Sequence, residues 1–474
     1  ILSWYQYSDD LGASGNLRND AARSNAPGDA AFARSTLAFT RRISVRDASF
    51  RQEFGVTVSP AHLLEAGMEV HALATAWGWN ISGDRNTSQA NGSSAEGGTS
   101  LPAVLDSTAL ANRAGVWLLD RYRPFSRVTL EPGLRVDWSG LARQSVVSPR
   151  FALSVDLGGG YRIRGSAGRF AQSPGYEKLV QSDYFVDLTG AAAHGITSER
   201  SVHVLGAIEH AFAPGLLARV EGYYKSFDRL IVGRLETPAE TAARVALYAF
   251  PGDVAASVPA APQITSVPSN GATGRAYGVD VFVSHQPTDA TERLAGWASY
   301  TFGKADIDSY GRRYAFDYDR RHAISLVGTY RLMRGLELAA TFRIASGFPY
   351  TPVIGLRVAA SAQADANGVA TRYVPQVDAN GLYVWTTDLG GVSNLNTGRL
   401  PVFARLDLRA TFRPRWSGSR WQIYVEIINA LNRSNAGGFD PVLQYNPNGN
   451  RPLLTYTASG GLPLIPSVGV RYRF

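Results

Sequence analysis

The sequence predicts an all-β protein, a transmembrane antiparallel β-barrel with about sixteen strands in this chain. Three observations predict this fold. Apolar and polar residues alternate in many short runs, so each strand has one apolar and one polar face. Tight turns and long polar loops follow one another in alternation, as they do in outer-membrane barrels. The number of predicted strands is even, as it is in single-chain bacterial barrels.

The last nine residues show the pattern most clearly. One face of this predicted strand carries Val468, Val470, Tyr472 and Phe474, and the other carries Ser467, Gly469, Arg471 and Arg473. A membrane barrel turns its apolar face to lipid and its polar face to the lumen. We therefore expect the two arginines to point into the lumen. The terminal aromatic Phe474 resembles the signal that the barrel assembly machinery reads in outer-membrane proteins.

The same alternation places fourteen further strands in order, so fifteen of the about sixteen expected strands have a position. They are residues 1–8, 47–58, 64–71, 130–138, 151–157, 161–170, 202–209, 218–225, 277–284, 294–302, 324–332, 336–344, 405–413 and 421–427. Short turns are expected at 59–61, 158–160, 214–215, 334–335 and 417–418, where Gly, Pro and Ser gather. A first polar loop runs to about residue 34. Long extracellular loops are expected near 82–112, 235–270, 352–400 and 434–465, within a single barrel domain that covers residues 1–474.

Composition excludes several classes of protein. The chain has 474 residues, 45% of them hydrophobic, but no long uninterrupted apolar run that would predict a transmembrane helix. It has no Cys, so disulfides, thiol catalysis and Cys-ligated zinc are excluded. The net charge is +8, yet the arginines are spread singly along strands, which argues against nucleic acid as a partner. A soluble sandwich or propeller is the alternative fold, but it does not explain why short turns alternate with long loops.

No motif predicts an enzyme, a cofactor or a metal site. The seven histidines lack metal-ligand spacing, and the Gly-x-Ser-x-Gly elbow of hydrolases is absent. The glycine run at 158–160 joins two strands, so it does not indicate a phosphate loop. The sequence Asp-Ala-Asn-Gly occurs at 365–368 and 378–381; it indicates turns, with half of a calcium loop as the weaker interpretation.

Charged residues on the predicted lumen faces are the candidates for contact with a ligand or with another domain. They are Arg219, Glu221, Arg343, Arg405, Asp407, Arg409 and Glu426. Their alternative role is to keep the lumen polar and to pair with neighbouring strands, which any such barrel requires. For each single residue this second role is favoured.

Several short motifs, in one order along the chain, carry a family resemblance. They are Ser148-Pro149-Arg150-Phe151, Gly168-Arg169-Phe170 with Gln172 and Pro174, Tyr223-Tyr224-Lys225 with Asp228 and Leu230-Ile231, Gly274-Arg275-Ala276-Tyr277-Gly278-Val279, Asp319-Arg320-Arg321-His322, Ser346-Gly347-Phe348-Pro349-Tyr350-Thr351-Pro352, Asn429-Ala430-Leu431-Asn432, and the terminal Arg471-Tyr472-Arg473-Phe474. In the seventh motif, Ala430 stands where Leu is usual. With these motifs the chain resembles the C-terminal β-barrel of a TonB-dependent outer-membrane receptor.

The resemblance implies a function and a set of partners. Members of this family bind a scarce small-molecule or peptide ligand at loops and plug apices, and TonB pulls on the plug to admit the ligand through a 22-stranded barrel. No plug domain and no TonB-binding box are recognised here, and we expect the chain to be the later part of such a receptor, in the bacterial outer membrane among its lipids. The alternatives are a passive sixteen-stranded porin and a structural or adhesive outer-membrane barrel.

Overall fold

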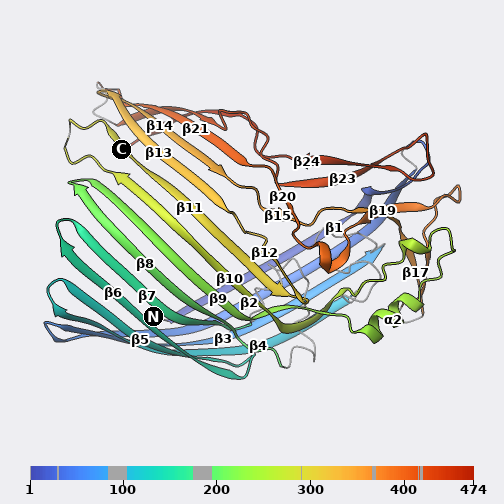
Figure 1. Ribbon diagram of the computed structural model, residues 1–474, viewed down its shortest axis with the longest axis horizontal. Helices are drawn as coiled ribbons and strands as arrows, with labels where there is room; N and C mark the ends of the chain where they lie inside the picture. The colour runs from blue at the N-terminus through green and yellow to red at the C-terminus, as the bar shows by residue number, and fades with distance from the viewer. Residues whose placement is uncertain are drawn as a thin grey trace.

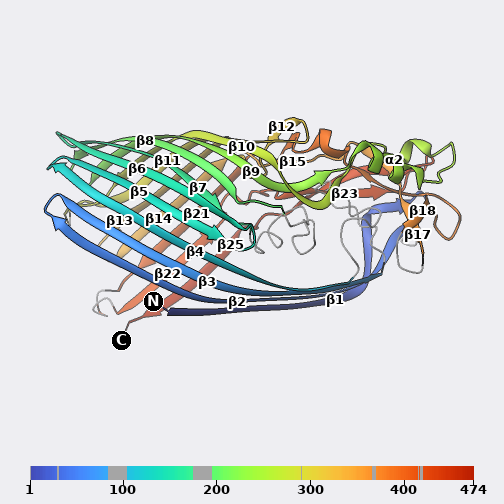
Figure 2. The same cartoon turned by 90° about the horizontal axis from the view of Figure 1, so that it is seen from below.

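One large antiparallel sheet dominates the computed structural model (Figures 1 and 2). The structure describes residues 2–28, 31–83, 104–174, 195–289, 291–365, 370–414, 416 and 420–473. Within them the sheet has 19 strands, of which β12 (Arg312–Ala315), β16 (Gly355–Val358) and β19 (Val384–Asp388) are short additions at the loop end. The sixteen strands that remain, here called the wall strands, agree with the predicted number.

The wall strands follow one another in chain order around the sheet. They are β1 (Leu2–Ser24), β2 (Phe32–Ser59), β3 (His62–Gly83), β4 (Val104–Phe125), β5 (Val128–Ser139), β6 (Gln144–Gly158), β7 (Tyr161–Gln172), β8 (Glu199–Ala213), β9 (Leu216–Leu235), β10 (Ile264–His285), β11 (Leu294–Ser309), β13 (His322–Met333), β14 (Leu336–Ala345), β21 (Phe403–Phe412), β22 (Trp421–Ile428) and β25 (Ile465–Tyr472). Each pairs antiparallel with the next, so the backbone polar groups of the strands between β1 and β25 are satisfied by their neighbours; no pairing joins β25 to β1 among the described residues.

The two ends of the wall differ sharply, as predicted. At one end, turns as short as the pair of residues between β8 and β9 join the strands, and Gly215 there has φ +78. A Cβ at Gly215 would lie 2.1 Å from the carbonyl oxygen of Gln286, so only glycine fits this turn. At the other end lie the long connections and all the short elements. Both chain termini lie at the short-turn end (Figures 1 and 2).

The long connections contain regular structure of their own. The β9–β10 connection holds α2 (Pro238–Ala246) and η3 (Ala255–Ser257), and the β22–β25 connection holds β23 (Gly438–Gln444) and β24 (Leu453–Ser459). The β14–β21 connection contains β16 and β19 together with β15 (Pro349–Tyr350), β17 (Ala360–Ala364), β18 (Ala370–Pro375), η4 (Gly391–Asn394) and β20 (Gly398–Arg399). No helix in the described part of the chain is long and apolar enough to cross a bilayer.

The predicted boundaries of two loops are wrong. The first polar loop, expected to run to about residue 34, is mostly strand, because β1 extends to Ser24 and β2 begins at Phe32. The loop expected at 82–112 overlaps β4, which begins at Val104 and pairs along β3. Strand β2 has 28 residues, whereas about 10 cross a bilayer. Outside lipid both faces of a strand can be polar, so the alternation that marks strands in sequence disappears there.

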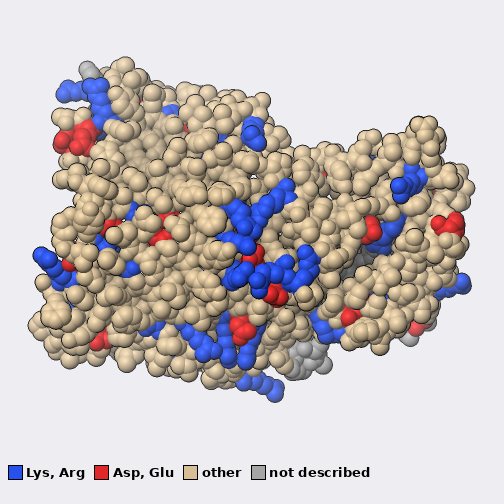
Figure 3. All heavy atoms as spheres, viewed as in Figure 1, with Lys and Arg blue, Asp and Glu red and all other residues tan. Residues whose placement is uncertain are grey.

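The outer surface of the wall is apolar. On β25, Val468 and Val470 are 71% and 59% exposed, whereas Ser467 and Gly469, which alternate with them, are less exposed. Figure 3 shows a face that is largely uncharged, with Lys and Arg side chains gathered around its middle. So many exposed apolar side chains on strand faces are not compatible with water, and they define the lipid-facing surface.

We expect the substitution Val204→Arg to destabilise the folded barrel by about 2–4 kcal/mol, because the 49% exposed side chain of Val204 faces lipid. The matched control is Leu205→Arg, one residue along β8 on the lumen face, which we expect to cost less than about 1 kcal/mol. Urea unfolding in lipid vesicles measures both changes. Equal destabilisation by the two variants would contradict the assignment of the faces.

Candidate functional site

The seven predicted lumen charges all lie on strand faces opposite the exposed apolar residues. In β21, the Arg405 side chain donates to Asp407 at 2.8 Å, and the backbone N–H of Asn429 donates to the same carboxylate at 2.9 Å. Arg343 lies opposite Arg405 in the register of β14 and β21, and Arg409 lies opposite Glu426 in that of β21 and β22. Of the seven, Arg405 and Asp407 therefore form an ion pair, as the structural interpretation predicts, and the register sets Arg409 beside Glu426.

Two polar cavities lie along the lumen face of the sheet. One of ≈ 420 Å³ is formed by β5 to β9 and includes Glu131, Arg164, Arg219 and Glu221. The other, of ≈ 370 Å³, is formed mainly by β2 to β7. It brings together three acidic and two basic residues with His71, whose ring nitrogen lies 3.0 Å from the carboxylate of Asp47. Charges of both signs line each cavity, so both suit a polar, multiply hydrogen-bonding ligand.

A recurring arrangement on the lumen face places an aromatic ring over a glycine and a cation beside the ring. A Cβ at Gly67 in β3 would lie 2.2 Å from the ring of Trp117 in β4. The guanidinium groups of Arg51 and Arg135 lie 5.1 and 5.2 Å from the centroid of that ring. The missing side chain of the glycine gives the ring room to lie flat on the sheet.

The same arrangement recurs where the chain ends. Here a Cβ at Gly469 in β25 would lie 2.2 Å from the Tyr424 ring, and the Arg409 guanidinium lies 4.0 Å from the centroid of that ring. In both places the aromatic ring stabilises the neighbouring guanidinium group by a cation–π interaction. Sequence alternation identified the faces but not these contacts, since they join residues on neighbouring strands.

A continuous loop layer covers the loop end of the barrel; it comprises the β9–β10, β14–β21 and β22–β25 connections with the tip of β1. A tilted ring contact between Tyr248 and Tyr373, at 4.7 Å between centroids, joins the first connection to the second. Pairing of β19 with β1 joins the second to the first strand of the chain. The side chain of Asn25, just beyond β1, donates to the carbonyl oxygen of Asn446 at 2.8 Å and so reaches the third.

The loop layer is anchored to the wall at Asp319, which is 1% exposed. Its carboxylate accepts hydrogen bonds from the backbone N–H of Ala305 at 2.7 Å and from Arg321 Nε at 2.8 Å, and it pairs with Arg399. Arg399 also donates to the carbonyl oxygen of Gly347 at 3.2 Å. Two of the sequence motifs, at 319–322 and 346–352, therefore meet at one buried ion pair.

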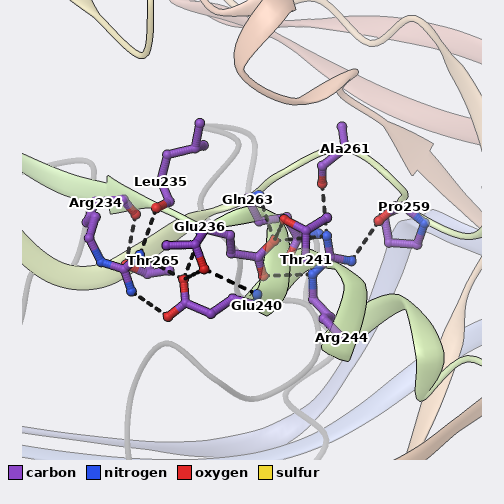
Figure 4. A network of polar contacts seen from close by, with 11 residues as sticks. Arg234, Leu235, Glu236, Glu240, Thr241, Arg244, Pro259, Ala261, Gln263 and Thr265 are labelled. Atoms are coloured by element: carbon purple, nitrogen blue, oxygen red, sulfur yellow. Dashed lines mark hydrogen bonds and ion pairs between the residues drawn. The ribbon is translucent and has the colours of Figure 1, made fainter.

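A second polar network braces the β9–β10 connection (Figure 4). The guanidinium group of Arg244 in α2 donates to Glu236 at 2.8 Å, and the two side chains are only 7% and 8% exposed. Arg244 also donates to the carbonyl oxygens of Pro259 and Ala261, at 2.6 and 2.9 Å. Through Arg244, helix α2 is thus hydrogen-bonded both to Glu236, which directly follows β9, and to the segment that follows the helix.

The first turn of α2 adds a capping box. The backbone N–H of Glu240 donates to the Thr237 hydroxyl at 3.2 Å, and the backbone N–H of Thr237 donates to the Glu240 carboxylate at 2.7 Å. Hydrogen bonds from Arg234 and Thr237 lower the pKa of Glu240 to about 2. Sequence reasoning placed this helix in a loop, although Thr-Pro-Ala-Glu at 237–240 is a recognisable helix start.

The second Asp-Ala-Asn-Gly sequence forms a turn, as predicted. The Asp378 side chain accepts the backbone N–H groups of Asn380 and Leu382, both at 2.9 Å, and Gly381 has φ +78. Most of the first copy lies outside the described residues, as does Phe474. In the described part of the chain no group of three or more His, Asp or Glu could hold a metal ion.

The fold and its lumen define the class of protein: a large transmembrane barrel with a polar lumen and an ordered layer of loops at one end. A family described as TonB dependent receptor-like, beta-barrel matches residues 2–430. The chain belongs to this family, and it is a protein of the bacterial outer membrane. No curated protein sequence matches it.

Solved structures of receptors and transporters share the fold. The ferripyoverdine receptor of the outer membrane of Pseudomonas aeruginosa is 10% identical with a TM-score of 0.55, covering 99% of this chain and 53% of its own. The FrpB iron transporter of Neisseria meningitidis is 13% identical, with a TM-score of 0.54 and coverage of 99% and 63%. The outer membrane transporter YddB of Escherichia coli is 11% identical, with a TM-score of 0.53 and coverage of 100% and 63%. The chain thus spans between half and two thirds of these relatives.

The ring of Trp117 leaves no room for a side chain at Gly67. We expect Gly67→Ala to displace the ring and to lower stability by about 1–3 kcal/mol, as overpacking does. Gly206→Ala is the matched control, because a Cβ at Gly206 in β8 has no atom within 4 Å. Thermal unfolding in detergent measures both, and an equally small effect at the two positions would contradict the tight glycine–ring contact.

The β9–β10 connection should loosen in acid. Burial raises the pKa of Glu236, but hydrogen bonds from Arg244, Gln263 and Thr241 outweigh it and leave the pKa below its ordinary 4.5. The pKa of Glu236 is lower in the folded loop than in the unfolded chain. The ionised carboxylate therefore contributes its full stability above pH 4.5, and this stability is lost as the pH falls through the lowered pKa.

Since the chain has no Cys, a spin label at a single Ala243→Cys substitution reports the mobility of α2 alone. We expect an immobile label at pH 7 that gains mobility only below pH 4.5. In the variant Glu236→Gln the label should be mobile at every pH. A label in that variant that remains immobile at pH 7 would show that the Arg244 ion pair does not hold the loop.

Proposed function

We propose that this chain is the barrel of an outer-membrane receptor that takes up a scarce ligand with energy supplied through TonB. The observation that carries the proposal is the loop layer. The β14–β21 connection crosses to pair with β1, so ordered loops from distant parts of the chain form one surface at one end of a polar lumen. Such a surface suits capture of a ligand from outside before it enters the barrel.

In this proposal the loop layer faces the cell exterior and the short turns face the periplasm. The lumen charges contact a plug domain, through which TonB acts, and the passing small-molecule or peptide ligand. The barrel itself binds and conducts and catalyses no reaction. The barrel assembly machinery inserts it, with Phe474 as part of the signal that the machinery reads.

The two cavities support a polar route through the barrel. They lie on neighbouring strands of one wall, β2 to β9, and both carry arginine and carboxylate side chains. A ligand with several hydrogen-bonding groups can exchange its water for these side chains in steps. A passive porin also has a polar lumen, and for this reason energy dependence is the property that separates the two functions.

Uptake by whole cells tests the proposal. Cells that make the full-length receptor are incubated with a mixture of siderophores, cobalamin, sugars and peptides, and mass spectrometry follows which compound leaves the medium. We expect one compound class to be depleted in cells with TonB, and we expect depletion to stop in cells without TonB or after an uncoupler collapses the proton-motive force. Depletion that continues without TonB would instead identify a passive pore.

A further inference from the structure

A row of cations lies on the lipid-facing side of the wall, next to the loop layer. It comprises Arg169, Arg200, Arg229, Arg275 and Lys304, with Asp228 and Asp306 as the acidic residues among them, and is called the rim patch here. The register places its members on adjoining strands. Arg169 lies opposite the exposed Val202, Arg200 opposite Asp228, and Arg275 opposite Asp306, and all of these share the face of the exposed apolar residues.

Among the described residues, the cations of the rim patch outnumber the carboxylates beside them. Arg275 and Lys304 share the carboxylate of Asp306, at 3.6 and 3.3 Å, and Arg229 lies 3.7 Å from Asp228. Neither Arg169 nor Arg200 has an ion pair or side-chain hydrogen bond among the described residues, and the buried Nε of Arg200 has no partner there. Arg229 and Arg169 repel Arg200, and the attraction of Asp228 is weaker than either repulsion. Five cations thus face two carboxylates, on the face where Figure 3 shows Lys and Arg gathered near the middle.

Aromatic side chains fix the level of the rim patch relative to the membrane. Tyr224 and Tyr300 are 49% and 37% exposed on the same lipid-facing side, and Tyr277 lies between their strands opposite Tyr224. Outward aromatic residues of this kind form the girdle at the boundary between hydrocarbon and headgroups. Arg275 is two residues beyond Tyr277, on the side of the loop layer, so the rim patch lies at headgroup level.

We propose that the rim patch binds the phosphate groups of lipopolysaccharide in the outer leaflet of the outer membrane. The proposal rests on the outward orientation of the loop layer. Phosphate is the complement of this patch because guanidinium groups bind it through paired, charge-assisted hydrogen bonds. Four of the five cations are arginine, and cations at headgroup level attract anionic lipid. A bound headgroup gives Arg169 and Arg200 the partners that the described residues do not supply.

Binding of purified, full-length protein in detergent to bisphosphorylated lipid A tests the proposal by native mass spectrometry. Monophosphorylated lipid A and phosphatidylglycerol are the comparison lipids. We expect lipid A with two phosphates to bind most tightly, and R169Q/R200Q/R275Q to weaken its binding about tenfold or more, because each cation at headgroup level adds several-fold. The matched control R127Q/R293Q/R334Q removes the same charge from turns at the opposite end, and binding should change less than about twofold.

A second variant tests the proposal without removing a cation. Asp228 is 63% exposed, so Asp228→Asn should fold normally. It should tighten binding of bisphosphorylated lipid A about threefold, since one repulsive charge is gone. Circular dichroism confirms folding of each variant. Equal binding of lipid A and phosphatidylglycerol, equal losses in the two triple variants, or no gain in D228N would each overturn the proposal.

Discussion

The structure depends on one constraint: within hydrocarbon, every backbone N–H and C=O group needs a partner, and lipid offers none. A strand satisfies these groups only through its neighbours, and for that reason the sixteen wall strands form a single ladder in chain order. The same constraint explains the short turns. A strand that must pair with the one before it can reverse within a few residues, as at Gly215, where only glycine fits against the carbonyl oxygen of Gln286.

Because side chains alternate across each strand, one ladder produces two unlike surfaces. The outer surface carries Val, Leu, Ile and aromatic side chains, and its cations occur where the strands leave the hydrocarbon. The inner surface concentrates charge, and neighbouring residues neutralise much of it, as Arg405 and Asp407 do. Two glycines on the inner surface are needed for packing, because Gly67 and Gly469 provide the space in which the rings of Trp117 and Tyr424 lie flat. The lumen is therefore built by contacts across three or four neighbouring strands at a time.

Beyond the bilayer, interactions other than the demand of lipid for paired backbone groups hold the chain in place. Water can satisfy the backbone there, so strands are free to end, and yet β2 continues for 28 residues and the connections fold into strands and a helix. Ion pairs that contain a buried carboxylate support these parts. Asp319 with Arg399 joins the loop layer to the wall, and Glu236 with Arg244 braces α2. Removing one partner of such a pair leaves an uncompensated buried charge, so these pairs impose a single arrangement on the loops.

Sequence alone determined the class of fold, the approximate number of wall strands, the lipid-facing side of the wall strands other than β4 and most of the turns, because bilayer and lumen impose a period of two along each strand. It also led to the right family through motifs such as 319–322. It did not determine where strands end outside lipid, where that period disappears, and it placed α2 and the pairing of β1 with β19 in loops. The ion pair of Asp319 with Arg399 and the rim patch join residues 80 and more than 100 positions apart. Only the register of the folded sheet brings such residues together, since a pattern along the chain records the face of each strand but not its neighbour across the barrel.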